Sequence, residues 1–150
     1  MKLCSACLLG VNCRYDGGNK LNGKVIELAK TEVLIPVCPE QLGGLPTPRE
    51  SAGIYNGSGN DVVNGKAYVL TINRGVDVTK YFTKGAEEVL KLAKFYDITE
   101  VILKQKSPSC GCGKTWQLND DLVNRVVDGD GVTAALLKSN GIKIMSEDDL

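Results

Sequence analysis

The residues with the most evident chemistry in this sequence are its six cysteines. They stand at positions 4, 7, 13, 38, 110 and 112, and the chain contains no histidine. Without an imidazole there is no Cys-His pair to activate a thiol and no histidine ligand for a metal. We expect a cytoplasmic protein, and in a reducing cytoplasm cysteines are more often metal ligands or reactive thiols than disulfides.

Three of these cysteines follow predicted strands. Cys7 lies near the end of an apolar run at 3–9, Cys38 comes directly after the run at 33–37, and Cys110 follows the run at 100–104 by a few residues. In open α/β sheets, the residues at the carboxyl ends of the strands collect at one edge. These three thiols can therefore meet in a single crevice.

The spacing of the cysteines leaves two other interpretations open. Cys4 and Cys7 form a C-x-x-C, and Cys110 and Cys112 form a C-x-C, so these four could hold a structural or regulatory zinc ion. Alternatively, Cys4 and Cys7 could serve a thiol redox protein. In an extended strand Cys4 and Cys7 point to opposite faces, which counts against ligation by both.

The elements that must position the cysteines alternate between strands and helices. Strands are predicted at 3–9, 33–37, 67–72, 100–104 and 142–145, and helices at 24–30, 77–96 and from 132. Residues 39–65 are typical of a loop with a short strand near 54–55, and the pattern in 114–130 is too weak to assign. We predict one α/β domain over residues 1–150, with an open, largely parallel, Rossmann-like sheet, flanking helices and a short antiparallel hairpin.

The composition narrows the class of partner. Eighteen basic residues balance eighteen acidic ones, so no overall field favours a nucleic-acid polymer. No apolar stretch reaches the length of a membrane span. We expect a small-molecule partner, with neither a nucleic-acid polymer nor a membrane.

Three segments in chain order resemble the thiouracil desulfidase family. They are residues 5–10 (SACLLG) with 14–17 (RYDG), 37–40 (VCPE) with 43–49 (GGLPTPR), and 106–111 (KSPSCG). The resemblance implies a 4Fe-4S cluster held by Cys7, Cys38 and Cys110, with the fourth iron free of protein ligands. It also implies a catalytic acid/base pair, Glu40 and Ser107.

The implied activity is hydrolytic removal of sulfur from a small thiolated heterocycle or nucleotide, of the thiouracil or 4-thiouridine monophosphate type. Residue type alone gives plainer roles, since Glu40 suits a helix start and Ser107 suits a turn. Arg14, Arg49 and Lys106, together with Lys104, flank the three segments and are candidates to bind a substrate phosphate, with salt bridges as the alternative.

Overall fold

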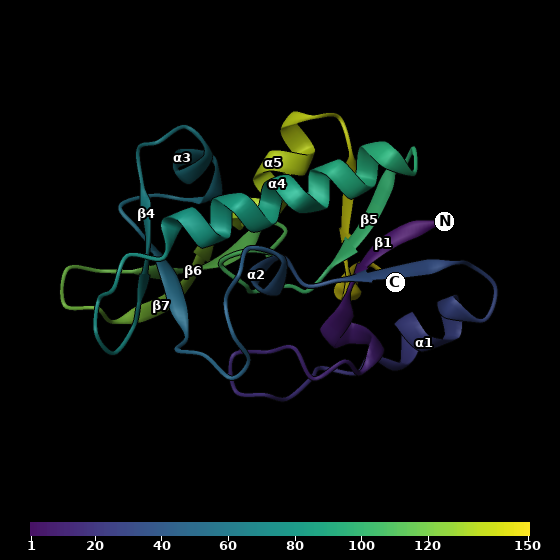
Figure 1. Ribbon diagram of the computed structural model, residues 1–150, viewed down its shortest axis with the longest axis horizontal. Helices are drawn as coiled ribbons and strands as arrows, with labels where there is room; N and C mark the ends of the chain where they lie inside the picture. The colour runs from purple at the N-terminus through teal and green to yellow at the C-terminus, as the bar shows by residue number, and fades with distance from the viewer.

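The computed structural model describes residues 1–150 and contains two four-stranded sheets, which occupy opposite halves of the molecule (Figure 1). The first sheet has the order β2-β1-β5-β8 and is parallel throughout. Its strands are β1 (Lys2–Ser5), β2 (Leu34–Val37), β5 (Glu100–Leu103) and β8 (Lys143–Ser146).

The second sheet is mixed, with the order β4-β3-β6-β7. Its strands are β3 (Ala52–Tyr55), β4 (Tyr68–Thr71), β6 (Lys114–Leu118) and β7 (Asn124–Asp128). The pairs β3–β4 and β6–β7 are antiparallel, whereas β3 and β6 run parallel in the centre. Two hairpins far apart in the sequence therefore join to form this sheet.

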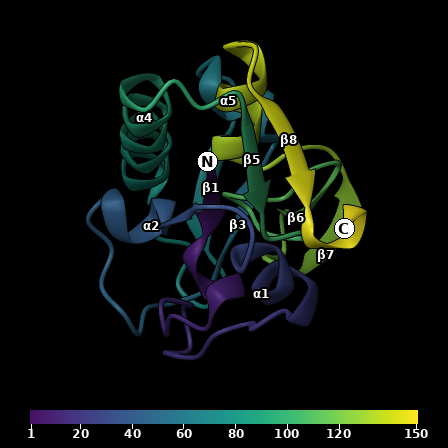
Figure 2. The ribbon, with the colours of Figure 1, turned by 90° about the vertical axis from the view of Figure 1, so that its right-hand side faces the viewer.

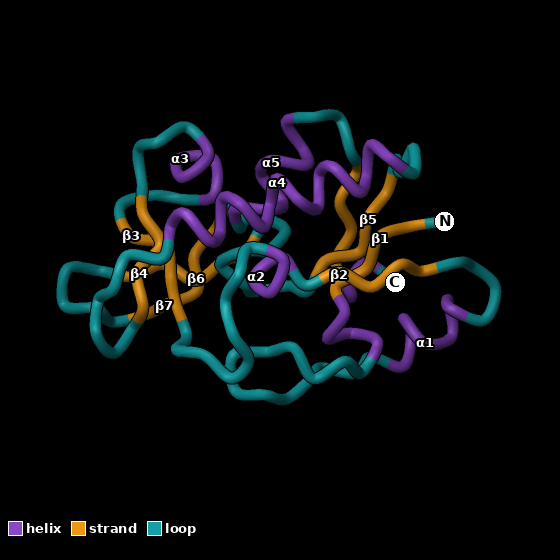
Figure 3. Tube along the Cα trace, viewed as in Figure 1, coloured by secondary structure: helices purple, strands orange, loops and turns teal.

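Five α-helices and one short 3₁₀ helix connect the strands, and a second 3₁₀ helix follows the last strand (Figure 3). The α-helices are α1 (Gly23–Ala29), α2 (Pro39–Leu42), α3 (Gly59–Val63), α4 (Thr79–Phe95) and α5 (Val132–Ser139), and the 3₁₀ helices are η1 (Ala6–Leu9) and η2 (Glu147–Asp149). No helix is long and apolar enough to span a membrane.

The parallel sheet is covered on both faces, as parallel sheets usually are. Leu3 and Val101 belong to a core cluster on one face together with residues of α4 and α5, whereas Cys4 and Ile102 belong to a cluster on the other face together with α1. All four side chains are fully buried. Figure 2 shows α4 on one side of these strands and α1 on the other. The apolar runs of β1 and β5 thus reflect burial on two sides.

Helix α4 packs against both halves of the molecule (Figure 1). Phe82 and Ala86, in its first half, belong to the core cluster of the mixed sheet, and Val89 and Ala93, further along, belong to that of the parallel sheet. The three- and four-residue spacing of these side chains places them on one face of the helix. One helix therefore fixes the two sheets relative to each other.

Helices α2 and α4 touch through glycines. A Cβ atom on Gly43 would lie 1.9 Å from the carbonyl oxygen of Tyr81, and one on Gly85 would lie 1.9 Å from that of Pro39. No side chain fits at either position. Glycine at both positions is therefore needed for the two helix backbones to lie this close together. This contact holds the beginning of α2 against a long, well-packed helix.

The predicted α/β class is confirmed, with a parallel sheet and an antiparallel hairpin that pairs 52–55 with 68–71. The strands divide over two sheets because residues 114–130, which gave no clear pattern, form β6 and β7. The expected strand at 3–9 ends at Ser5, and η1 begins at Ala6. Residues 39–65 also contain α2 and α3, which are too short for a helical period to be visible.

Candidate active site

A cavity of about 400 Å³ opens where the parallel sheet faces the mixed sheet. The parallel half contributes Cys7, Cys38 and Cys110, and the mixed half contributes Ala52, Trp116 and Asn124. The three cysteines that the resemblance implies as cluster ligands, the acid/base pair and the candidate phosphate binders all line this one cavity. The carboxyl edge of a parallel sheet is where α/β folds bind ligands, in agreement with this position.

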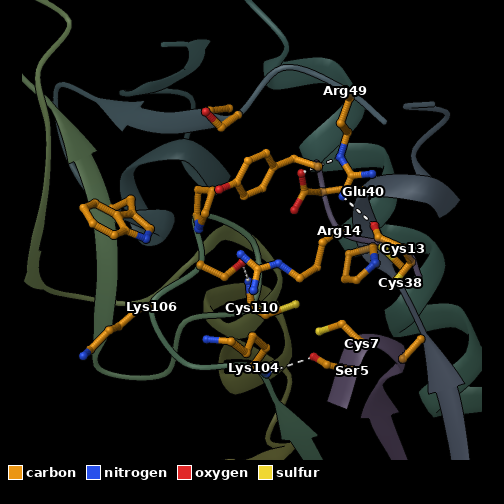
Figure 4. A pocket seen from close by; sticks show the side chains of 18 of the residues that line it. Ser5, Cys7, Cys13, Arg14, Cys38, Glu40, Arg49, Lys104, Lys106 and Cys110 are labelled. Atoms are coloured by element: carbon orange, nitrogen blue, oxygen red, sulfur yellow. Dashed lines mark hydrogen bonds and ion pairs between the residues drawn. The ribbon is translucent and has the colours of Figure 1, made fainter. Parts of the chain in front are cut away.

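Each predicted ligand cysteine is placed by a different connection after a strand. Cys7 lies in η1 immediately after β1, Cys38 is the N-cap of α2 after β2, and Cys110 lies in the loop after β5. Figure 4 shows the sulfur atoms of Cys7 and Cys110 turned toward the same space. Cys13, from the loop after η1, also lines the cavity, so four thiols surround it.

The thiols are held in a setting that disfavours their charged form. Burial raises the pKa of Cys110, which is 7% exposed, to about 12. The hydrogen bond with Cys13 and then burial raise the pKa of Cys38. For Cys13, the hydrogen bond with Cys38 lowers the pKa, but contact with Cys7 and burial outweigh it and bring the pKa to about 11. These thiols become thiolates at neutral pH only if a cation compensates them.

Cys4 and Cys112 lie outside the cavity. The Cys4 thiol is fully buried and donates to the carbonyl oxygen of Ser5 at 3.7 Å, and the Cys112 thiol faces that of Ile144 at 4.0 Å. No three cysteine, aspartate or glutamate side chains are close enough together to hold a single metal ion. The four-cysteine zinc site is therefore not assembled in this fold.

Glu40 lies in the first turn of α2, two residues after Cys38, with its side chain 20% exposed to the cavity. Its Oε1 atom is 3.0 Å from Nε of Arg49. Glu40 therefore lies at a helix start, as its residue type suggests, and it also lines the cavity. One carboxylate oxygen is bound by arginine, and the Oε2 atom is left without a protein donor.

Arg49 uses its whole guanidinium group on protein atoms. Its Nη1 donates to the Thr47 hydroxyl at 3.0 Å and to the Pro46 carbonyl at 3.2 Å, while Nη2 donates to the Cys13 carbonyl at 2.9 Å. The side chain is 6% exposed. This geometry joins Glu40 to the loop that contains Cys13 and leaves no guanidinium nitrogen without a protein acceptor.

Ser107 closes the turn that contains Cys110. Its Oγ accepts hydrogen bonds from the amides of Ser109 at 3.2 Å and Cys110 at 3.0 Å. With the oxygen occupied by two donors, the hydroxyl proton is the part of the group available to a ligand. Ser107 therefore stabilises a turn, as its residue type suggests, and it also lines the cavity.

Gln105 fixes the ends of the same loop. Its amide oxygen accepts from the backbone amide of Cys112 at 3.0 Å, and its amide nitrogen donates to the Cys112 carbonyl at 2.7 Å. The backbone amide of Gln105 itself donates to Glu147 at 2.7 Å. The segment from Ser107 to Cys110 is thus held between two anchored points.

The other basic residues of the cavity differ in how far they are engaged. Arg14 lies 5.4 Å from the ring centre of Tyr15 and 3.9 Å from Asp16, and Lys104 lies 3.4 Å from Glu147. Lys106 pairs with no carboxylate and has a positive φ of 54°. Figure 4 shows Arg14 and Lys104 beside Cys110, whereas the side chain of Lys106 lies further from the cysteines and points away from them.

Comparison with known proteins agrees with this site. Residues 3–149 match the family model described as 2-thiouracil desulfurase. The chain belongs to this family of desulfurases. The prediction of family membership is confirmed, and with it the prediction that the chain is an enzyme of the thiouracil desulfidase class.

Two relatives cover nearly the whole desulfurase chain. One is the uncharacterized protein YbbK of Bacillus subtilis (strain 168), which is 43% identical over all of this chain and 97% of its own length. The other is a solved structure of a [4Fe-4S]-dependent thiouracil desulfidase, TudS, at 38% identity and a TM-score of 0.83. It covers 99% of this chain and 91% of its own.

Sequence reasoning missed the contribution of the mixed sheet to the cavity of this desulfurase. Asn124 lies in β7, within the segment 114–130 for which the sequence predicts no element. For Tyr15 and Trp116 the sequence alone favours core or surface packing over stacking on a base, but both residues line the cavity. A buried polar residue in a segment without periodicity leaves no signal in a single sequence.

Proposed function

We propose that this chain removes sulfur hydrolytically from a thiolated pyrimidine, using a 4Fe-4S cluster held by Cys7, Cys38 and Cys110. The observation that supports this most directly is the meeting of these three thiols with Glu40 and Ser107 in one cavity. The dependence of the structural relative TudS on a [4Fe-4S] cluster points the same way.

The residues present fit such a cluster. The donors are sulfur atoms without a histidine among them, as is usual for iron-sulfur ligation. They line a cavity and do not converge on the point that a single ion would occupy. The pKa values of Cys38 and Cys110 are raised, so a cationic group is needed to stabilise the thiolates of these two residues.

When bound, the cluster supplies an iron without a protein ligand, a Lewis acid for the sulfur of the substrate. Glu40 then acts as the general base. Its Oε2 takes a proton from a water molecule that adds to the thiocarbonyl carbon, while Arg49 holds Oε1. The carbon–oxygen bond forms, the carbon–sulfur bond breaks, and hydrosulfide leaves without any change in oxidation state.

Ser107 donates a hydrogen bond to the heterocycle. Because its oxygen already accepts from two backbone amides, the hydroxyl is oriented as a donor and is poorly suited to act as a base. A donor at this position stabilises the negative charge that develops on the ring when water adds. Glu40 therefore carries the proton from the water molecule to the products, and Ser107 contributes a hydrogen bond without taking up a proton.

The finer substrate class that we propose is a nucleoside monophosphate such as 4-thiouridine monophosphate. Arg14, Lys104 and Lys106 line the cavity, and Lys106 is free of protein carboxylates. Trp116 and Tyr15 offer aromatic faces for the base. We therefore assign phosphate binding to Arg14 and Lys106. Arg49 is left out because all its guanidinium nitrogens already donate to protein acceptors.

Purification without oxygen tests this function. A brown protein with broad visible absorption, about four irons and four sulfides per chain, and release of hydrosulfide from thiouracil is expected. Comparison of thiouracil, its nucleoside and its monophosphate then tests the phosphate site. A colourless protein that binds zinc, or activity that depends on a Cys4–Cys7 disulfide, would contradict the proposal.

A further inference from the structure

Ser5 is a serine at a helix start that does not cap its helix. It ends β1 and is the N-cap of η1, but its side chain accepts no hydrogen bond from that helix. Its Oγ atom instead accepts from the backbone amide of Lys104 at 2.9 Å, at the point where the neighbouring strand β5 has just ended. The Ser5 side chain is therefore fixed by the parallel sheet.

The hydroxyl proton of Ser5 has no oxygen or nitrogen acceptor in the protein, because the Lys104 amide is the one such partner of the group. Ser5 is 2% exposed and lines the cavity. A hydroxyl that accepts one hydrogen bond can still donate its proton in another direction. Buried polar groups nearly always find a partner, and the acceptors that remain here are sulfur atoms.

Strand geometry directs Ser5 toward Cys110. Residues two apart in a strand point to the same face, so Ser5 shares its face with Leu3, and Leu3 and Cys110 belong to the same core cluster. Figure 4 shows the Ser5 oxygen on the side of the cavity where the sulfur atoms of Cys7 and Cys110 lie. Burial raises the pKa of Cys110, and hydrogen bonding by the Ser5 and Ser109 hydroxyls opposes this rise. Ser5 therefore favours the thiolate form of Cys110.

The Cys38 sulfur is stabilised in a different way. Contact with Cys13 and burial raise the pKa of Cys38, and the backbone amide of Gln41 opposes this rise. At Cys38 the opposing donor is thus part of the backbone, whereas at Cys110 the donors are two side-chain hydroxyls. Substitution can remove such hydroxyls one at a time.

Ser109, the second hydroxyl beside Cys110, is shared with another residue. Its Oγ lies 2.8 Å from Oγ1 of Thr133, and both side chains are fully buried. Ser5 has no such partner for its proton. Of the two hydroxyls, Ser5 is therefore the one whose proton is free for the sulfur of Cys110.

We propose that Ser5 is a positioning residue that donates its hydroxyl proton to the sulfur of Cys110 in the cluster-bound protein. This inference rests on the proposed function, in which Cys110 is a cluster ligand. Hydrogen bonds to ligand sulfurs withdraw negative charge and raise the reduction potential of a cluster. An electron-poorer iron is also a stronger Lewis acid toward the sulfur of a substrate. Ser5 thus acts on the reaction through Cys110.

The test measures the reduction potential of the cluster in anaerobically reconstituted protein. In Ser5→Ala the ratio of reduced to oxidised cluster at a fixed applied potential should fall about threefold to tenfold, because the more negative state loses a hydrogen bond. Ser5→Thr keeps the hydroxyl and should keep the potential. Ser146→Ala is the matched control, because Ser146 is also a buried serine at the end of a parallel strand but does not line the cavity. It should leave the potential unchanged.

Resonance Raman spectra of the wild type in light and heavy water give a second measurement that needs no substitution. The iron–cysteine stretching modes should shift on exchange, and the shift should persist in Ser5→Thr and shrink in Ser5→Ala. If Ser5→Ala does not retain a cluster, the shift in the wild type decides.

Equal potentials in the wild type and Ser5→Ala, an equal fall in Ser146→Ala, or the absence of an isotope shift in the wild type would overturn the inference. A wild-type protein that binds no cluster would refute the proposed function and this inference with it. A loaded, active wild type whose potential does not depend on Ser5 would refute the role of Ser5 alone.

Discussion

Nε of Arg49 lies 3.0 Å from Oε1 of Glu40, and the same guanidinium group binds the carbonyl oxygen of Cys13 at 2.9 Å. Arginine thus connects the carboxylate, two residues from Cys38, with the loop that follows Cys7. A planar fork with several donors can hold such an arrangement in a single geometry. We interpret Arg49 as the residue that positions the base.

Replacing Arg49 should therefore reduce turnover more than substrate binding. We expect Arg49→Ala to lower kcat about tenfold to hundredfold with a small change in KM, because a misplaced base costs rate. Arg49→Lys should restore little, since one ammonium group cannot replace the fork. Steady-state kinetics of hydrosulfide release, with iron content as a check on loading, measures this.

Arg74→Ala is the matched control, because Arg74 is an exposed arginine that also pairs with a glutamate, Glu50. It should leave kcat unchanged. A rise in KM for a monophosphate substrate in Arg49→Ala, with kcat intact, would instead assign Arg49 to phosphate binding, as its sequence position alone suggested.

The cysteines should separate into two groups by iron content. Cys7→Ala, Cys38→Ala and Cys110→Ala should each lose the cluster, because each removes one of its three ligands. Cys4→Ala and Cys112→Ala should keep about four irons per chain, since both thiols lie outside the cavity. Iron and sulfide analysis after anaerobic reconstitution measures this.

Cys13→Ala is the informative variant among the cysteines because this thiol also lines the cavity. We expect it to load the cluster as the wild type does. Loss of iron in Cys13→Ala together with retention in Cys7→Ala would show that the ligand set is Cys13, Cys38 and Cys110.

Ser107 should affect both stability and rate. Ser107→Ala removes the acceptor for two backbone amides, and we expect a loss of about 1 kcal/mol in the free energy of unfolding. Loss of the hydroxyl donor should lower kcat about a hundredfold. Urea denaturation of the metal-free protein and kinetics of the loaded protein measure the two effects separately.

Ser107→Thr keeps the hydroxyl, and it should recover most of both properties. Recovery of stability without recovery of rate would be consistent with the hydroxyl as a donor that needs one particular orientation. Full activity of Ser107→Ala would remove Ser107 from the mechanism.

The glycine contact between α2 and α4 should be sensitive to a single methyl group. Gly85→Ala places a Cβ atom 1.9 Å from the Pro39 carbonyl oxygen, so the two helices must separate. We expect a loss of about 2 kcal/mol in the free energy of unfolding, typical of overpacking. Lys84→Ala, exposed on the same helix, is the control for urea denaturation and should change little.

The parallel half of the protein could be predicted from the sequence because its signals are strong. Apolar runs such as Val101 to Leu103 are buried on both faces, and the period of α4 follows from its packing on two cores. The convergence of Cys7, Cys38 and Cys110 then followed from the rule that strand ends collect at one edge.

The mixed half could not be predicted in the same way. In β7, Arg125 and Val126 are both exposed and Asn124 is partly buried, so the strand has no clean alternation of apolar and polar residues. Strand β7 pairs with β6 in a local hairpin, but this hairpin joins the sheet only through the pairing of β6 with β3, which lies far earlier in the chain. Tertiary pairing, which local propensity does not encode, decides such segments.

The meeting of two sheets at the cavity has a consequence for how this enzyme can diversify. The cysteines and Glu40 belong to one wall of the cavity, whereas Ala52 and Asn124 belong to strands of the mixed sheet and Ile72 directly follows one. We therefore expect that substitutions at Ala52 or Ile72 change which substrate is accepted and leave Cys7, Cys38 and Cys110 in place. Selection, in nature or in the laboratory, can act on substrate scope and on chemistry separately.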